Sequence, residues 1–240
     1  MKKKLYIILG VVVGVLAAAY LAVIFFIGSL VTTAVNRFGP EIAKTSVKLT
    51  AAHISPFSGE GDLDLLVVGN PPGWSSADAA TFKKIHISVV PSSIFSSHVI
   101  IREIVIDGPV FDYETKFVNS NIGELVNNME GEKGNEANEA KTKSGETKRF
   151  EIDHLVIKDG SVHLGVAGMH EITLKLPTVD YHDLGKGTGG VTSTELAALV
   201  GRTLLTDIVQ ASSNAIGKVV PAGSDLIKNA GSALKGLFGH

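Results

Sequence analysis

No cysteine occurs anywhere in the sequence. This absence excludes a disulfide framework, a thiolate-bound iron–sulfur cluster or zinc ion, and a cysteine nucleophile. The chain also lacks an excess of charge of either sign, because its 22 basic and 24 acidic residues nearly cancel to a formal charge of -2. Proteins that bind nucleic acid usually carry a basic field, so we expect no nucleic acid among the partners of this chain.

Signatures of catalysis are also missing. The sequence has no G-x-S-x-G elbow and no H-E-x-x-H pattern, and its eight histidines are scattered through strand and loop patterns. A predicted turn separates His163 from His170, which favours surface positions over a shared metal ion. Asp62 and Asp64 alternate along one strand, as residues on a solvent face do. We therefore expect a non-enzymatic protein without metal or cofactor.

A long apolar run near the N-terminus is the clearest feature present. Residues 5–31 contain no charge, and as a helix they would span about 40 Å against roughly 30 Å of hydrocarbon. A cleaved signal peptide has an apolar core of only about 7 to 15 residues, so the run predicts an uncleaved anchor. Three lysines at 2–4 precede it, which predicts a cytoplasmic N-terminus. We assign 1–37 to this tip and anchor.

Residues 38–182 are predicted to form one mainly β domain. Short stretches there alternate apolar and polar residues and are bounded by glycine, proline, serine and asparagine, which is typical of strands. The predicted strands are 47–54, 61–68, 82–90, 98–107, 110–115, 150–158, 161–166 and 171–176. In 98–107 both alternating sets of residues are apolar, which predicts a strand covered on both faces.

Two segments of this region resemble each other: REIVIDGPVFDYE at 102–114 and DHLVIKDGSVHLG at 153–165. The Asp107-Gly108 pair of the first matches the Asp159-Gly160 pair of the second. Asp-Gly is a favoured hairpin turn. The repeat therefore predicts an antiparallel sheet of about eight strands, built by adding similar hairpins.

Polar segments separate and follow these repeats. Residues 130–149 hold five acidic and five basic side chains and little apolar surface, which predicts a disordered loop. Residues 183–192 include GKGTGG, which lacks the order of a phosphate loop and is predicted to be a glycine-rich linker.

The last part of the chain, 193–240, changes to helical spacing. Apolar residues three and four positions apart predict a helix over 193–219, with Ser193 or Thr194 as its cap and Pro221 as its stop. A second amphipathic helix is predicted after Ser224. Their apolar stripe packs on the sheet, lies on a membrane or closes a groove, and the sequence leaves these three alternatives open.

Three segments carry a resemblance to a known family: VKLTAAHISPFSGEGDLDLLVVGNPPGW at 47–74, SSIFSSHVIIREIVIDGPVFDYE at 92–114 and NSNIGEL at 119–125. They resemble the AsmA-like family of bacterial envelope proteins, in which a short membrane helix precedes strands joined by G-N-P-x-G and G-P steps. The matching turn motif here consists of Gly69, Asn70, Pro71, Gly108 and Pro109.

The resemblance implies an elongated, groove-like sheet with an apolar inner face, similar to bridge-like lipid-transfer proteins of the chorein type. It implies a bacterial inner-membrane protein with a periplasmic bulk that binds or transfers phospholipid, or supports outer-membrane assembly. The candidate lipid-facing residues are Val99, Ile101, Ile104 and Val105. About eight strands would extend only about 40 Å, so envelope proteins or further copies are expected as partners. The alternative is an anchored scaffold that binds no lipid.

Overall fold

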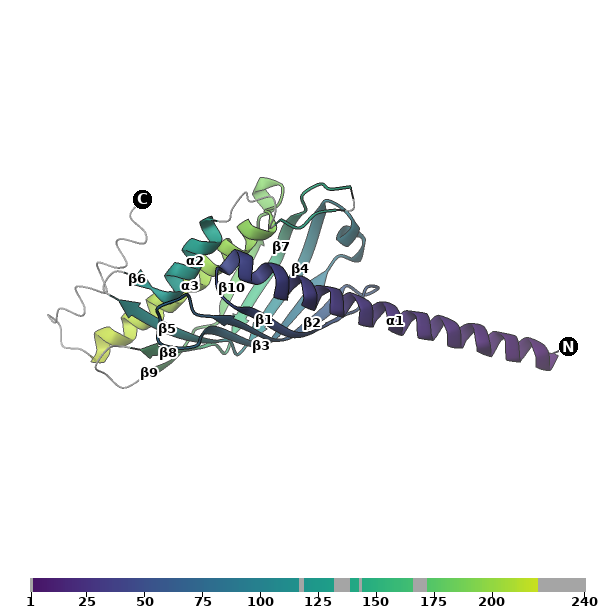
Figure 1. The fold of residues 1–240 in the computed structure, drawn as a ribbon, viewed down its shortest axis with the longest axis horizontal. Coiled ribbons are helices and arrows are strands. Elements are labelled where there is room, and N and C mark those ends of the chain that lie inside the picture. The colour runs from purple at the N-terminus through teal and green to yellow at the C-terminus, as the bar shows by residue number, and fades with distance from the viewer. Residues whose placement is uncertain (1, 117–118, 132–138, 143, 166–171, 220–240) are drawn as a thin grey trace.

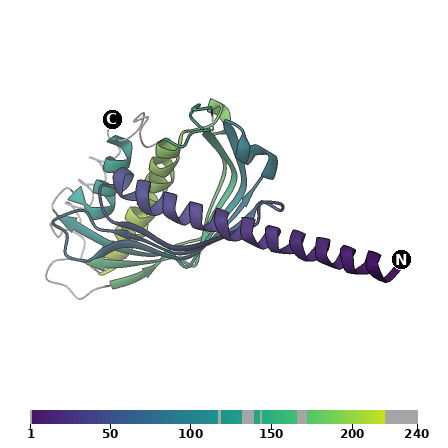
Figure 2. The same ribbon diagram turned by 45° about the vertical axis from the view of Figure 1, so that its right-hand side comes forward.

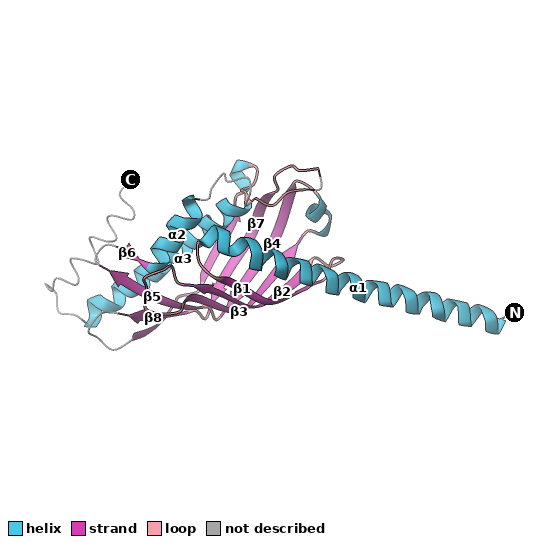
Figure 3. Cartoon of the chain, in the orientation of Figure 1, coloured by secondary structure: helices cyan, strands magenta, loops and turns pink. Residues whose placement is uncertain are grey.

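The computed structural model describes residues 2–116, 119–131, 139–142, 144–165 and 172–219 (Figure 1). They form a mixed α/β structure with one large, mostly open sheet and a long N-terminal helix (Figure 3). In chain order the elements are α1 (Lys2–Ala43), β1 (Val47–Ile54), β2 (Glu60–Gly69), β3 (Asp78–Val89), η1 (Pro91–Phe95), β4 (His98–Asp107), β5 (Val110–Lys116), β6 (Asn119–Ser120), α2 (Asn121–Gly131), β7 (Arg149–Lys158), β8 (Ser161–Gly165), β9 (Ile172–Lys175), β10 (Val179–Leu184), η2 (Lys186–Thr188) and α3 (Ser193–Val219).

Strand β3 organises the sheet. It pairs with β2 along one edge, and β2 pairs in turn with β1. Its other edge is shared, because β4 pairs with its C-terminal half and β5 with its N-terminal half. Strands β7 and β10 follow β4, and β8 and β9 follow β5. The described sheet has ten strands rather than about eight, since β6 and β10 fall in segments where the sequence pattern predicted none.

The predicted hairpins at the two Asp-Gly steps are wrong. Both β4 and β5 run antiparallel to β3, so the chain bends at Gly108 and continues in the same direction. Strand β7 lies parallel to β4, and β8 lies parallel to β5. One left-handed residue makes each bend, with φ of 58° at Gly108 and 54° at Asp159. The two repeated segments are therefore neighbouring bent strands, and the sheet is mixed rather than antiparallel.

A bulge explains the apolar pattern of β4. Glu103 pairs with Ser88 but Ile101 pairs with Val89, so Arg102 is an extra residue. An extra residue exchanges the faces on which the following side chains point. Inner-face side chains are therefore odd-numbered before the bulge and even-numbered after it. The expectation of a strand covered on both faces is therefore wrong. The apolar residues before and after the bulge occupy odd-numbered and even-numbered positions, but they lie on the same inner face.

The core lies on one face of the sheet, which we call the inner face. Figures 1 and 2 show α2, α3 and the end of α1 on this side of the curved sheet. Each fully buried leucine or isoleucine contributes about 1.5–3 kcal/mol relative to an exposed one. The largest fully buried apolar side chains are Leu49, Ile152, Leu155, Ile157, Val162, Leu164 and Ile208.

Helix α1 extends from the apolar run into the domain and ends at Ala43 rather than near residue 37. Its last turns cover the free edge of β1. The Asn36 side chain donates to the Leu49 carbonyl at 3.0 Å and accepts the Leu49 N–H at 2.6 Å, so it replaces a strand partner. Gly28 lies so close that a Cβ there would approach the Ala52 oxygen to 2.1 Å. This cover protects an edge that would otherwise be open to pairing.

The segment 130–149 is not a disordered loop in the part that the structure describes. Residues 132–138 and 143 lie outside the described residues. A bridge between Lys141 and Thr147 joins the two described parts of this segment, and Glu139 is buried. Composition alone missed this order because Glu139 finds hydrogen-bonding partners on α3.

The segment 183–192 is not a flexible linker. Its first residues end β10, η2 follows, and Val191 forms a bridge with Phe150. Helix α3 is confirmed with the predicted bounds 193–219. Its cap is Thr192, whose hydroxyl accepts the Glu195 N–H at 3.3 Å while Glu195 accepts the Thr192 N–H at 2.8 Å, a capping box. The second predicted helix lies outside the described residues.

Candidate functional site

Three of the four candidate lipid-facing residues share the inner face. Ile101 pairs with Ile152 and Ile104 pairs with Leu155, both of which are core residues, and Val99 lies on the same side of β4. Val105 does not join them. It pairs with His86 on the polar side of the sheet, because the bulge at Arg102 reverses the faces between these positions.

The inner-face candidates lie inside the core. Val99 is 7% exposed and Ile101 is 8% exposed, and half-buried Ile104 packs against the core cluster. Helix α3 contributes side chains such as Leu204 and Ile208 to the same cluster. In the described structure this apolar face is therefore packed, and an acyl chain would reach it only by displacing part of that cover.

Polar contacts hold helix α3 against the rest of the domain at its first turn and at Asp207. Glu139 accepts the Ser193 N–H at 2.9 Å and bonds the Thr194 hydroxyl. Burial alone would raise the pKa of Glu139, but these hydrogen bonds lower it. Further along, Tyr181 of β10 donates to Asp207 at 3.2 Å, and burial raises the pKa of Asp207. A carboxylate at the start of the helix also complements its dipole.

The turn motif forms part of a network of hydrogen bonds. Gly69 is buried, and a Cβ there would meet the Ser46 hydroxyl at 2.1 Å, so a larger residue would force the Ser46 side chain to rotate away. The Asn70 side chain donates to the Ser76 carbonyl at 3.0 Å and accepts from Asn121 at 2.7 Å. Asn121 is completely buried at the start of α2. The motif therefore joins the β2–β3 connection to α2, as a structural rather than a catalytic element.

Glu114 extends this hydrogen-bond network. Its carboxylate accepts the backbone N–H of Ser75 at 3.0 Å and that of Ser76 at 2.7 Å, together with both hydroxyls. Burial acts to raise the pKa of Glu114, but these donors outweigh it and lower that pKa to about 2. Pro109, the other end of the motif, is fully buried beside the bend of the chain.

Two exposed phenylalanines mark one end of the sheet. Phe57 in the β1–β2 turn is 72% exposed, and its ring lies 5.3 Å from that of Tyr20 on α1. Phe95 at the end of η1 is 82% exposed. The Val89 N–H donates to the Gly59 carbonyl at 2.8 Å, which holds the two loops together. Sequence reasoning missed both residues, although an aromatic residue inside a Ser/Pro/Gly turn is a usable signal of exposure.

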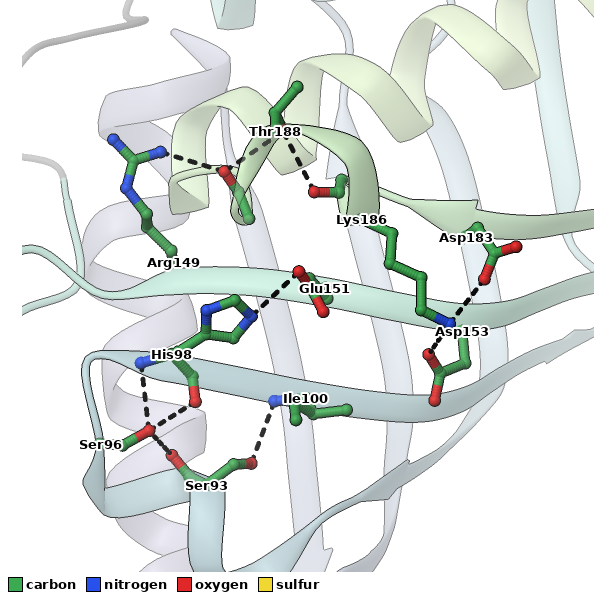
Figure 4. Close-up of polar contacts among 12 residues, drawn as sticks. Ser93, Ser96, His98, Ile100, Arg149, Glu151, Asp153, Asp183, Lys186 and Thr188 are labelled. Atoms are coloured by element: carbon green, nitrogen blue, oxygen red, sulfur yellow. Dashed lines mark hydrogen bonds and ion pairs between the residues drawn. The ribbon is translucent and has the colours of Figure 1, made fainter.

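The opposite face of the sheet, which we call the outer face, is polar. All histidines that the structure describes lie there, and each has a carboxylate within ion-pairing distance. In Figure 4, His98 of β4 points at Glu151 of β7 with 3.2 Å between nitrogen and oxygen. Lys186 of η2 lies between Asp153 and Asp183 at 3.0 and 2.8 Å. The described histidines are His53, His86, His98, His154, His163 and His182.

Within the described residues, α1 is the one helix long and apolar enough to cross a membrane. Comparison of the sequence with protein-family models and with curated proteins finds no match. The resemblance to AsmA-like proteins therefore stays a prediction that rests on the segments quoted above.

Proposed function

We propose that this protein is a non-enzymatic envelope module, anchored in the bacterial inner membrane by residues 5–31, that handles phospholipid on the inner face of its sheet. Its bulk would lie in the periplasm, where it binds or transfers lipid or supports outer-membrane assembly. The observation that carries the proposal is the contact between Tyr20 and Phe57, because it holds one end of the sheet beside the apolar part of α1.

The exposed part of α1 fits this arrangement. Described side chains from Tyr6 to Phe26 are exposed, and burial begins with Gly28. A helix from residue 6 to residue 26 rises about 30 Å, the thickness of the hydrocarbon layer. Tyr20 would then lie in the outer leaflet, and Phe57 beside it would enter the membrane.

The inner face offers the chemistry that an acyl chain needs. Apolar side chains continue across it from β1 to β10, and α2 and α3 form a cover that is separate from the sheet. A groove would arise if α3 moved away from the strands. The sheet alone is too short to bridge an envelope, so the module would act near its own membrane or with partners, either envelope proteins or further copies.

A packed core favours the second candidate, an anchored scaffold that binds no lipid. Val99 and Ile101 are buried, which is the expectation for a closed domain rather than an open groove. Both candidates place the same end of the sheet at the membrane. They differ only in whether lipid reaches the inner face.

Site-specific photo-crosslinking in vesicles of phosphatidylethanolamine and phosphatidylglycerol separates the two. An aliphatic diazirine side chain would replace Phe57, Phe95 or Ile104, with Thr173 on β9 as the exposed control. Lipid handling predicts phospholipid adducts at all three test positions and none at the control. The scaffold predicts adducts at Phe57 and Phe95 only. Absence of adducts at Phe57 and Phe95 would contradict membrane contact and with it both candidates.

A further inference from the structure

A cluster of side chains that could bind a metal ion lies on the outer face, away from the candidate lipid-facing residues. His154 of β7 pairs in register with His182 of β10, and their rings stack with centroids 4.6 Å apart and 3° between planes. Asp180 precedes His182 by two residues, so both side chains point to the same face. One histidine from each strand and one carboxylate thus meet at the edge of the sheet.

The ligand atoms of this cluster converge. The Asp180 Oδ1 atom lies 2.8 Å from His154 Nε2 and 3.0 Å from His182 Nε2, and the three ligand atoms all lie within 4.8 Å of one another. In a tetrahedral zinc site with bonds of about 2.0–2.1 Å, neighbouring ligand atoms are roughly 3.3 Å apart. Small rotations of exposed side chains would bring the cluster to that spacing.

A fourth residue orients one of the ligands. Glu103 Oε1 lies 3.0 Å from His154 Nδ1. A carboxylate on the far nitrogen of a histidine ligand fixes the tautomer and makes the near nitrogen a better donor to metal. A cation bound at Nε2 would leave the Nδ1–H of His154 to donate to Glu103.

We propose that His154, Asp180 and His182 form a solvent-open site for a divalent cation of the zinc class, with Glu103 orienting His154. Two imidazoles and one carboxylate form a donor set that suits Zn²⁺. The side chains of His154, Asp180 and His182 are 30%, 56% and 64% exposed, so the fourth coordination position faces water. The site joins edge strand β10 to β7 and is independent of the proposed function.

The sequence carries a weak signal for this site. Asp180-Tyr181-His182 alternates two ligands with one inward side chain, which is how ligands line one face of a strand. The segment showed no clear strand pattern, and its partner His154 is distant in the sequence. Only the pairing of β7 with β10 brings them together.

The test titrates the full chain in detergent micelles, stripped of metal by EDTA, with ZnCl₂ in a calorimeter. We expect one saturable Zn²⁺ site, weakened at least 10-fold in His182→Gln and Asp180→Asn. Glu103→Gln should weaken it about 10-fold, as loss of an orienting carboxylate does. His86→Gln is the matched control, because it removes an outer-face histidine that lies between two carboxylates.

Two further measurements distinguish loss of the metal site from misfolding of a variant. Melting temperatures without metal should agree among the parent and the variants, and added Zn²⁺ should raise that of the parent and of His86→Gln only. Co²⁺ should give visible absorption bands that disappear in His182→Gln. The site is refuted if the parent binds no Zn²⁺ saturably, or if His182→Gln and His86→Gln bind it equally well.

Discussion

The inner and outer faces of the sheet differ in burial and in polarity. Inner-face side chains such as Ile152 and Leu155 are completely buried, whereas their outer-face neighbour His154 stays partly exposed beside carboxylates. Both faces belong to the same strands, so the backbone cannot account for the contrast. Stability is therefore concentrated on the inner face, and the outer face is left with polar groups whose contribution to folding is small.

The largest expected effect on stability comes from two adjacent residues of β4 that lie on opposite faces. Ile101 is buried on the inner face, and Ile100 is half-buried on the outer face. Ile101→Asp should cost about 3–5 kcal/mol, because a buried charge without a partner is strongly unfavourable. That loss would lower the melting temperature by roughly 10 °C or more. Ile100→Asp should cost far less, and equal losses in thermal denaturation would show that the two faces are not distinct.

A smaller effect is expected where α1 covers the sheet edge. Gly28→Ala places a methyl group against the Ala52 carbonyl and forces α1 away from β1, at a cost of about 1–3 kcal/mol, typical of overpacking. Gly14→Ala is the control, since a Cβ there meets nothing within 4 Å. Unfolding followed by circular dichroism should separate the two variants. A neutral Gly28→Ala would contradict the tight contact.

Glu114 provides a test in which stability depends on pH. Its pKa is depressed from 4.5 to about 2 in the folded state, so its contribution is present above pH 4.5 and is lost as the pH falls through about 2. Glu114→Gln should lower stability at pH 7 by about 1.5–3 kcal/mol, the range for a hydrogen bond to a charged group. The difference from the parent should shrink toward pH 2 in urea titrations, and a constant difference would exclude the carboxylate as its cause.

The smallest effect is expected on the outer face. Hydrogen bonding to Asp62 raises the pKa of His86 above 6.5, so its contribution is present below pH 6.5 and is lost as the pH rises through the raised value. Because the side chain is 41% exposed, His86→Gln should cost less than about 0.5 kcal/mol at pH 5.5. It should be neutral at pH 8.5. A loss that persists at pH 8.5 would assign His86 a packing role.

The sequence by itself determined which segments are strands and which are helices wherever a repeating pattern was long. Strands β1 and β4 and helix α3 have the predicted bounds, and the apolar run identified a helix able to cross a membrane. These features depend on periodicity, which is a local property. The same reasoning failed for α2, β10 and the turn after Glu139, where short or polar segments gain order from partners distant in the sequence.

Only the tertiary structure decided how the strands are arranged. The two Asp-Gly steps have the composition of hairpin turns, yet they bend continuing strands, because neighbouring segments supply the hydrogen bonds that carry the ladder past each bend. The Gly108 N–H donates to the Lys158 carbonyl at 2.9 Å, and the Ser161 N–H donates to the Pro109 carbonyl at 2.8 Å. In the same way the bulge at Arg102 separates Val105 from Ile101, and strand pairing joins His154 to His182. A sequence specifies side-chain alternation along one strand, whereas faces and sites depend on register between strands, which long-range hydrogen bonds determine.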